Sequence, residues 1–445
     1  MRVWKLIKPL LLSYAALVGL FLVSLVIAAV LPENRVRANI RRSLPLLQAE
    51  GDRPRIGGEG KDAQLANWTD SLMLNIIYNI EPHKPFKSAM EANYFAEPGK
   101  DLSRGSMIDS FAFQLENDLP ANTSYARYWH GYLVILRPLF LFFTLSEIRR
   151  VYQFVFLVLF ASIAYLVGKR ICFGAVLIFA VSLASINFLL IPLSFQYSSV
   201  FLIAFIASVI VLLFKRLSLS SMGLLFLIIG ALTSFVDLLT APLVTFGLPV
   251  ILVYLIGLQN KHYPSLREAF KMLLVTGLFW GMGYGLLWAS KWLVASMFLP
   301  QNVISDGLVR IFTRSWGDFP SYLNQDVPLF VHALRRNAAL MFTASKPQTW
   351  GFLAVLIGWV CLLIFRHKPW EQVKFVLPLV VMALFPYAWY IFAANHSVVH
   401  AHFTYRIQLV TVLASLAAML FSIDWGRIHA EVRGKATRWG ILQRK

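Results

Sequence analysis

The stretch Tyr132-Leu-Val-Ile-Leu-Arg-Pro-Leu-Phe-Leu-Phe-Phe-Thr-Leu145 decides the topology of this chain. It is apolar at most positions, but it covers only about 14 residues and contains Arg137 followed by Pro138. A helix needs about 20 apolar residues to cross a bilayer. If this stretch does cross, every later segment changes sides, so its assignment sets the sidedness of everything that follows.

The rest of the chain contains apolar runs of membrane-spanning length. Hydrophobic residues make up 58% of the 445 residues and charged residues only 14%, which is typical of a membrane protein. We therefore predict an all-α polytopic membrane protein with a single transmembrane domain over residues 1–445. About ten transmembrane helices are expected, near Leu10–Leu31, Val151–Val167, Ile171–Leu190, Phe195–Phe214, Leu219–Val236, Pro242–Leu258, Met272–Leu299, Trp350–Phe365, Phe375–Ala393 and Phe403–Phe421.

The net charge of +19 could indicate a nucleic-acid partner, but its distribution indicates membrane topology instead. The polar segment Pro32–His130 contains 13 of the 22 acids and 12 Lys and Arg, so it is nearly neutral. The excess positive charge lies in short clusters between the later apolar runs and in the tail at residues 423–445. We predict that the chain contacts membrane lipids and no nucleic acid.

The position of these basic clusters decides on which side of the membrane the 132–145 stretch lies. If it spans, the 16 Lys and Arg of the later clusters face outward; if it stays outside, they join Arg2, Lys5 and Lys8 on the inner side. The positive-inside rule favours the second arrangement. We therefore predict an interfacial or re-entrant helix at 132–145. It lies within a first outer loop (32–150), with a second outer loop at 300–349 and a cytoplasmic tail at 423–445. The protein is then a multi-pass protein of the cell membrane with both termini in the cytoplasm.

Two acids lie at the predicted outer ends of helices. Asp237 follows an apolar run directly, and an ionisable group beside hydrocarbon is costly and usually functional. Its alternative role is a turn former held by Thr240 or by the backbone. Asp70 lies where the first outer loop becomes apolar again, and the alternative there is a helix cap. We predict both as catalytic residues.

The segment Tyr125-Ala-Arg-Tyr-Trp-His-Gly-Tyr132 combines aromatic rings with Arg127, Trp129 and His130. Such a mixture suits a sugar face or a lipid headgroup, because rings stack on C–H surfaces while a cation holds a phosphate. An aromatic belt at the membrane interface is the alternative. We predict these three residues as substrate-binding.

Further cations are expected at the same end. Arg137 is flanked by apolar residues and should have an anionic partner. Lys291 lies about two turns inside its helix, where it either snorkels to the interface or pairs with a phosphate. His402 and Arg406 are four residues apart and share a helix face with each other, and His400 precedes them. No carboxylate or Cys near these histidines completes a zinc site, so anion binding at a helix start is favoured and no metal site is predicted.

Two carboxylates, surplus cations and aromatic rings above apolar helices suit a lipid-linked phosphate substrate. In this layout the sequence resembles the GT-C class of membrane glycosyltransferases, with a first helix, a long outer loop carrying an acid, interfacial helices, many spans and a second outer loop. The resemblance implies transfer of a sugar from a polyprenyl-phosphate donor to a glycan, lipid or protein acceptor on the outer face. It also implies inversion at the anomeric carbon of the sugar. Whether the transfer uses a divalent cation is left open by the resemblance.

On this hypothesis Asp70 is the general base and Asp237 positions the donor sugar or the acceptor hydroxyls. The departing lipid phosphate is neutralised by Arg127, Arg137, Lys291 and Arg406 and oriented by His130, His400 and His402. Two other functions stay open. A transporter or flippase of a lipid-linked glycan would hold its charges near the middle of the membrane, whereas a surface polysaccharide polymerase or ligase would use a diphosphate-linked donor.

Overall fold

The computed structural model describes residues 2–99, 105–214, 217–317, 319–343, 346–428 and 430–431. Within these ranges all regular elements are helices, apart from three isolated β-bridges. Seven helices or helix combinations are long and apolar enough to cross a membrane. The predicted all-α, membrane-embedded class is therefore confirmed.

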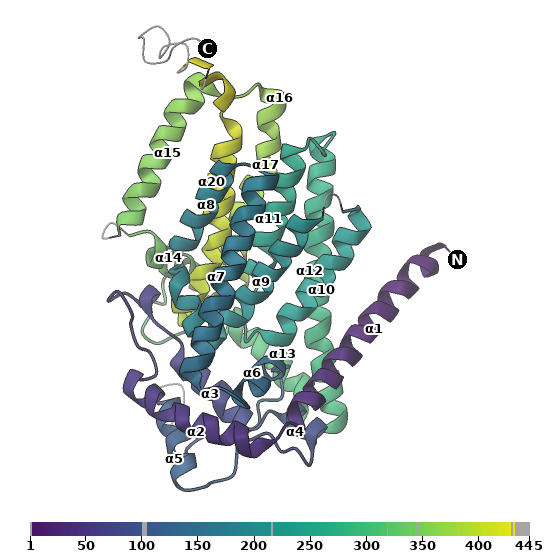
Figure 1. The fold of residues 1–445 in the computed structure, drawn as a ribbon, viewed down its shortest axis with the longest axis vertical. Coiled ribbons are helices and arrows are strands. Elements are labelled where there is room, and N and C mark those ends of the chain that lie inside the picture. The colour runs from purple at the N-terminus through teal and green to yellow at the C-terminus, as the bar shows by residue number, and fades with distance from the viewer. Residues whose placement is uncertain are drawn as a thin grey trace.

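The long apolar helices form an elongated bundle (Figure 1). The candidate spans are α1 (Arg2–Ala29), α7 (Leu145–Arg170), α9 (Phe195–Leu213), α10 (Leu219–Val236), α12 (Leu266–Phe298), α16 (Trp370–Val373) continued by η3 (Lys374–Val376) and α17 (Leu377–Phe392), and α19 (Ala401–Thr404) continued by η4 (Tyr405–Gln408) and α20 (Leu409–Ser422). Two apolar helices are shorter, α8 (Phe173–Ala184) and α11 (Leu243–Gln259), and in α15 (Pro347–Arg366) the apolar part that counts is the shorter stretch Thr349–Ile364. Helices thus occupy all ten predicted positions, but in the part of the chain that the structure describes, seven qualify as spans by length and composition, so the predicted count of about ten is not confirmed.

The deciding stretch at 132–145 forms α6 (Leu133–Phe140), a helix of 8 residues that is far too short to cross a bilayer. The chain then turns, and α7 begins at Leu145 with a capping box between Thr144 and Glu147. One side of α6, including Leu136 and Phe140, is fully buried. The helix therefore lies inside the end of the fold, beneath the helices of the first loop, and not along an open surface.

The remainder of the first loop forms a layer across one end of the bundle, at the bottom of Figure 1. Its amphipathic helix α2 (Glu33–Glu50) buries Val36, Ile40, Leu44 and Leu47, a spacing that places one apolar stripe against the layer. The other elements of the layer are η1 (Lys61–Ala63), α3 (Asn67–Tyr78), α4 (Pro85–Glu91) and α5 (Met107–Glu116). We call this end of the molecule the loop end.

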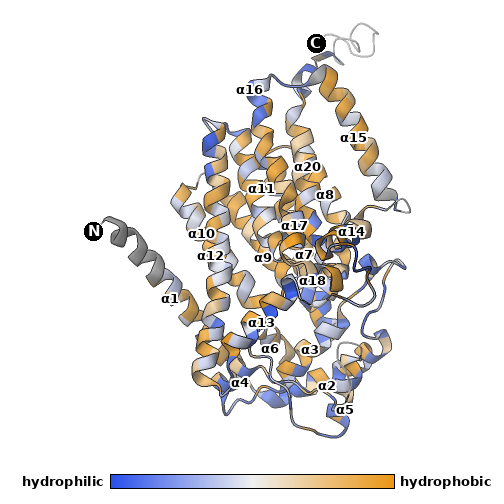
Figure 2. Cartoon of the chain, turned by 180° about the vertical axis from the view of Figure 1, so that it is seen from behind, coloured by the Kyte–Doolittle hydropathy of each residue, from blue (hydrophilic) through white to orange (hydrophobic). Residues whose placement is uncertain are grey.

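The second predicted loop lies at the loop end as well. It forms α13 (Val303–Ser315) and α14 (Leu329–Met341), which contact the short helix α18 (Ala394–Val399) that follows α17. A short helix between α8 and α9, η2 (Phe188–Leu193), also lies on this side of the bundle. Figure 2 shows hydrophilic segments at both ends of the molecule and mostly hydrophobic helices between them. Both long polar segments thus gather at one end, as the charge pattern predicts.

The closest helix pair of the bundle is α10 against α12, and glycines make this approach possible. A Cβ atom on Gly230 would lie 2.1 Å from the carbonyl oxygen of Trp280, and one on Gly283 would lie 2.0 Å from that of Leu227. Small residues at such crossings let helix backbones touch in membrane proteins. The pair fixes the C-terminal end of α10, where Asp237 follows.

Which end faces the cytoplasm stays a prediction from the positive-inside rule. The basic pair Lys215 and Arg216 and residues 432–445 of the predicted cytoplasmic tail lie outside the described residues.

Candidate functional site

Asp70 is completely buried on α3 and caps a helix that begins far along the sequence. Its carboxylate accepts hydrogen bonds from the backbone N–H groups of Phe195 (3.1 Å) and Gln196 (3.0 Å) and from the hydroxyl of Ser194 (3.1 Å). These donors form the first turn of α9, where unpaired N–H groups and the helix dipole favour a negative charge. Burial raises the pKa of Asp70 to about 6, against the lowering effect of Arg149 and of these donors. The contacts support a structural role.

An ion pair beside Asp70 ties the same layer together. Arg149 on α7 donates to both carboxylate oxygens of Glu50, at 2.7 and 2.9 Å, and to the side-chain oxygen of Asn67 at 3.0 Å. The side chain of Arg149 is only 7% exposed, so water screens the pair weakly. Through this network α2, α3 and α7 are held around the start of α9.

Arg137 also serves helix ends. Its guanidinium donates to the carbonyl oxygens of Ala28 (2.8 Å) and Ala29 (3.3 Å) at the end of α1, of Leu31 (3.0 Å) just after it, and of Ile77 (3.0 Å) in α3. These are carbonyls that the end of a helix leaves without an intrahelical partner. Burial lowers the pKa of Arg137 to about 10, which still leaves it charged at neutral pH. Its guanidinium nitrogens all donate to backbone carbonyl oxygens, so we assign Arg137 no role in substrate binding.

The aromatic segment before α6 packs on α12. The indole N–H of Trp129 donates to the carbonyl oxygen of Leu287 at 2.7 Å. The ammonium of Lys291 is fully buried, donates to the carbonyl oxygen of Met90 at 2.9 Å and lies 5.7 Å from the centre of the Trp129 ring. Lys291 therefore points into the protein and does not snorkel. Its neighbours fasten α4 and the aromatic segment to α12.

His130 and Arg127 have protein partners too. The ring nitrogens of His130 lie 3.0 Å from the hydroxyl of Tyr132 and 2.8 Å from the carbonyl oxygen of Tyr125. Burial lowers the pKa of His130 to about 3, so the ring is neutral. Arg127 pairs with Asp306 of α13 at 3.1 Å and lies over the ring of Tyr125. The pair joins the two loops at the loop end.

Like Asp70, Asp237 lacks a cationic partner within 4 Å of its carboxylate in the described part of the chain, but it lies in a turn and does not cap a distant helix. It follows the last residue of α10 and is only 3% exposed. Its two oxygens accept from the backbone N–H of Thr240, at 2.9 and 3.0 Å, which forms the turn that leads into α11. Burial raises the pKa of Asp237 to about 7, against the lowering effect of these turn contacts. A carboxyl with this pKa can accept a proton at neutral pH.

The turn that carries Tyr128 is clamped beside Asp237. The backbone N–H of Gly131 donates to the carbonyl oxygen of Phe235 at 2.8 Å, and a Cβ atom at Gly131 would lie 2.4 Å from the Phe235 ring. Only glycine allows this approach without displacing the ring. This close approach brings the phenol of Tyr128 near the Asp237 carboxylate, which acts on it electrostatically. Burial raises the pKa of the Tyr128 phenol.

Polar atoms around Asp237 remain without hydrogen bonds in the described residues. They are Nδ1 of His396, the hydroxyl of Tyr284 and the indole nitrogen of Trp288. The last two lie close enough to interact weakly with each other. The opposite nitrogen of His396 lies 2.7 Å from the carbonyl oxygen of Leu239, in the Asp237 turn. Buried polar groups are rarely left unpaired, so these atoms have hydrogen-bonding capacity that the described residues do not use.

Arg314 of α13 brings a positive charge to this place. Its guanidinium lies 2.8 Å from Nε2 of His400, and its charge acts on Tyr128, His396 and His400. Burial, together with these neighbouring cations, lowers the pKa of both histidines well below the ordinary value, so the rings are neutral. The neutral His400 accepts one N–H bond of Arg314. The pair can therefore present further guanidinium N–H groups to an anion.

Arg406 lies one turn further along and mostly holds the backbone. It donates to the carbonyl oxygens of His402 and Asp62, at 2.6 and 3.2 Å, and lies over the ring of Tyr197. Its Nε has no partner among the described residues. His402 itself is partly exposed and lies 6.2 Å, ring to ring, from His400.

The predicted site residues therefore separate into groups. Asp70, Arg137, Trp129, His130, Lys291 and the Arg127–Asp306 pair connect helices, whereas Asp237, His400 and His402 lie around a separate polar region. Unpaired buried polar atoms occur in both places, because Ser71, Gln196 and Arg149 near Asp70 each have one as well. Sequence reasoning missed Tyr128, Arg314 and His396 as members of the Asp237 region. Arg314 could have been noticed because it lies on the polar side of the amphipathic helix α13. The other side of this helix, with Leu308 and Phe312, is apolar and exposed.

An apolar groove lies between α11, α12 and α17. It has a volume of about 960 Å³ and is lined among others by Leu243, Phe246, Trp280, Phe385 and Phe392. Leu243 is the first residue of α11, directly after the Asp237 turn, and Phe392 ends α17 shortly before His396. The groove thus extends along the bundle and has one end near the Asp237 region.

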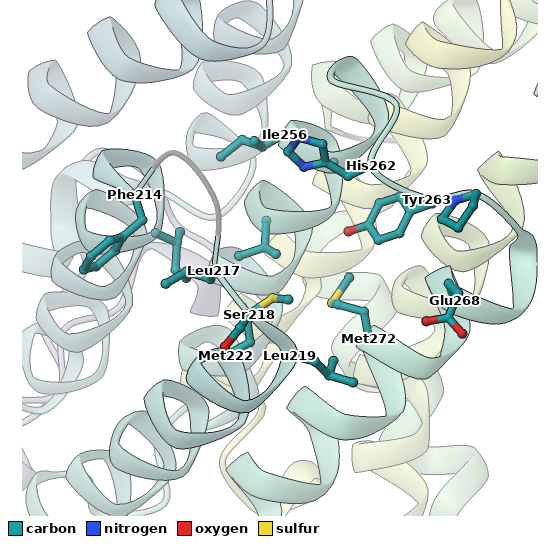
Figure 3. Close-up of a pocket in the computed structure, with 14 residues that line it drawn as sticks. Phe214, Leu217, Ser218, Leu219, Met222, Ile256, His262, Tyr263, Glu268 and Met272 are labelled. Carbon is teal, nitrogen blue, oxygen red and sulfur yellow. The ribbon is translucent and has the colours of Figure 1, made fainter.

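A cavity at the opposite end of α10 and α12 contains none of the predicted residues. Its volume is about 390 Å³, and its lining includes Ser218, His262, Tyr263 and Glu268 (Figure 3). Tyr263 stacks on Tyr254 of α11 with ring centres 5.1 Å apart. The cavity lies among the basic turns that the charge pattern assigns to the cytoplasm, and its polar lining is sparse.

Among the described residues, no group of three or more His, Cys, Asp or Glu that could hold a metal ion is found. The expectation of a possible divalent cation therefore depends on the resemblance alone. Comparisons with protein-family models, curated proteins and solved structures found no match for this chain. The fold and the contacts define a polytopic, all-helical membrane protein with a polar region at one end.

Proposed function

We propose that this protein is a membrane glycosyltransferase that moves a sugar from a polyprenyl-phosphate donor to an acceptor at the loop end, with Asp237 as general base. The observation that carries the proposal is the buried Asp237 carboxylate, which has a raised pKa and no ion-pair partner in the described residues. Unpaired polar atoms of His396, Tyr284 and Trp288 surround it. A perturbed acid of this kind next to unsatisfied groups is typical of catalytic sites.

The apolar groove between α11, α12 and α17 suits the isoprenoid tail of the donor. Pockets for apolar ligands of this kind are lined mainly by hydrophobic and aromatic side chains, with few polar groups at one end. The Arg314–His400 pair supplies the charge for the donor phosphate, because a guanidinium N–H bond to a phosphate oxygen is strong in a site that excludes water. His402 lies next to His400, with ring centres 6.2 Å apart, and Arg406 holds the carbonyl oxygen of His402.

The reaction that fits these residues is an inverting substitution. Asp237 removes the proton from the acceptor hydroxyl while that oxygen forms a bond to the anomeric carbon of the sugar. The bond between this carbon and the phosphate oxygen breaks on the opposite face, and the polyprenyl phosphate leaves with the electron pair. Arg314 stabilises the charge that develops on the phosphate. The proton ends on Asp237 and passes to solvent.

This proposal exchanges the predicted roles of the two acids. Asp70 has three donors of the α9 start on its carboxylate and is enclosed completely, so an acceptor hydroxyl would have to displace a helix cap to reach it. Asp237 accepts from the backbone N–H of Thr240 on both oxygens, and its other donors, Leu238 and Leu239, belong to the same local turn, so no distant helix depends on it. We therefore assign the base to Asp237 and the capping of α9 to Asp70.

The test is a transfer assay with the full chain in nanodiscs and a polyprenyl-phosphate sugar. Asp237→Asn is expected to lower the transfer rate by at least 100-fold, because loss of a general base typically costs about 10²–10⁴. The matched control is Asp109→Asn, an exposed acid of α5 in the first loop, which should keep the wild-type rate. Full activity of Asp237→Asn would refute the assignment.

Two further measurements separate the other functions. A diphosphate-linked oligosaccharide offered as donor under the same conditions should give no transfer, whereas a polysaccharide polymerase or ligase would use it. A fluorescent lipid-linked glycan should stay in its original leaflet when the chain is reconstituted in vesicles. Translocation without transfer would favour a flippase.

A further inference from the structure

A group of four cations lies at the loop end on the solvent side of His402. Arg53 and Arg55 belong to the segment between α2 and η1, Lys61 begins η1, and Arg336 lies on α14. Arg53, Arg55 and Lys61 are exposed, and Arg336 is partly exposed. We call these four residues the basic rim.

The rim is brought together by a folded segment. Residues 51–66 form a hairpin in which the backbone N–H of Ile56 donates to Ala63 and that of Leu65 donates to Pro54. The hairpin is fastened at Asp62, whose carbonyl oxygen accepts from the hydroxyl of Tyr405 and from Arg406. The backbone that carries Lys61 is thus held against the start of the last helix, and η1 contacts both α14 and α19.

The positive charge of the rim is not neutralised by nearby acids. The carboxylate of Asp62 pairs with Lys346 at 2.7 Å, and Glu59 in the same hairpin is exposed and makes no ion pair in the described residues. None of the four rim residues has a carboxylate within 4 Å among the described residues. Partial burial, followed by the charges of Arg336, Arg53 and Arg55, lowers the pKa of Lys61. Like charges held this close repel one another unless an anion binds between them.

The rim is distinct from the phosphate position proposed for the donor. Arg314 and His400 are half-buried and lie beside the Asp237 turn, whereas the rim opens to solvent. The charge of Arg53 also acts on His400 and His402, so the rim leads inward to the proposed site. A water-soluble part of a substrate would approach from this side.

We propose that the basic rim binds an anionic acceptor glycan, one whose sugars carry carboxylate or phosphate groups, and guides its hydroxyl toward Asp237. Guanidinium and ammonium groups at an open rim suit the repeated anions of such a chain, because several weak contacts add up along it. Binding should weaken as salt is added, since the contacts are exposed. The role of the glycan as acceptor rests on the proposed function, but its binding to the rim can be measured without any sugar transfer.

The experiment measures equilibrium binding of a galacturonate hexamer to the full chain in nanodiscs of neutral phosphatidylcholine. We expect saturable binding that weakens with salt, and no binding of the neutral maltohexaose. The double variant Lys61→Gln with Arg336→Gln should lose affinity at least tenfold. The control is Arg335→Gln, a neighbouring exposed cation of α14 outside the rim, which should bind as wild type.

Two results would overturn the inference. They are equal affinity of the double variant and the wild type for the hexamer, and equal affinity of the wild type for maltohexaose. Hexamer binding to Asp237→Asn is expected to match the wild type, so a failure of the glycosyltransferase proposal would leave this measurement intact. Melting curves of the variants, measured alongside, should match that of the wild type and so control for folding.

Discussion

Replacement of Asp70 by alanine tests whether this acid holds the fold or performs the chemistry. The change removes the acceptor for the two backbone N–H groups of Phe195 and Gln196 and for the hydroxyl of Ser194. All of these donors are buried, so water cannot replace the carboxylate without rearrangement of the α9 start. We therefore expect a loss of stability and not a selective loss of catalysis.

The magnitude follows from the opposing contributions. Each hydrogen bond to a charged group contributes about 1.5–3 kcal/mol, so three bonds give roughly 5–9 kcal/mol in favour of the native state. Burial opposes this, since a pKa raised to about 6 from 3.8 corresponds to about 3 kcal/mol that favours the neutral carboxyl. Removal of the side chain also relieves that cost. The net destabilisation expected for Asp70→Ala is about 2–6 kcal/mol, at or above the upper end of what an ordinary helix cap contributes.

The assay is thermal unfolding of the purified chain in detergent at pH 7.5, with the transfer rate measured below the melting temperature. Asp70→Ala should melt several degrees below the wild type, and Asp70→Asn should fall between them because the amide keeps one acceptor oxygen. Molecules that remain folded should retain transfer. An unchanged melting temperature combined with loss of transfer would refute the capping role and return Asp70 to the active site.

Four further outcomes are expected. The transfer rate should rise about tenfold per pH unit below pH 7 and level off above it, because Asp237 must be ionised to act as base; a flat profile from pH 5 to 8 would contradict this. Ionising a carboxyl with a raised pKa costs stability between pH 4 and 7, so Asp237→Asn should melt no lower than wild type at pH 8. Arg137→Gln should lower the melting temperature without changing the KM for the donor, and a raised KM would reassign Arg137. Arg314→Gln should raise the donor KM at least tenfold while Arg310→Gln, a control on the same helix, leaves it unchanged; equal effects of the two would remove Arg314 from the site.

The fold class and the arrangement of loops were accessible from the sequence because they depend on local length and charge. The apolar runs predict the bundle, and the near-neutral first loop against basic turns predicts that the two long polar segments share one end. The short helix at 132–145 was recognisable from Arg137 and Pro138. That it is buried beneath α2 was not, because the apolar stripe of α2 gives no indication of which partner covers it.

The site was harder to predict because its contacts join distant segments. Both alternatives noted for the acids, a cap for Asp70 and a Thr240 turn for Asp237, describe observed contacts. For Asp70 the capped helix is α9 and not its own α3, since the donors lie about 125 residues away. The partner expected for Arg137 was an anion, and the actual partners are carbonyl oxygens of helix ends. Sequence does not show which helix ends a buried cation will meet.

The measurement that tests the central claim most directly is the structure of the full chain bound to a non-hydrolysable polyprenyl-phosphate sugar. We predict that the phosphate lies against Arg314 and His400, that the isoprenoid tail occupies the groove between α11, α12 and α17, and that the sugar lies beside Asp237. A phosphate bound instead beside Lys291, with the sugar away from Asp237, would contradict the account.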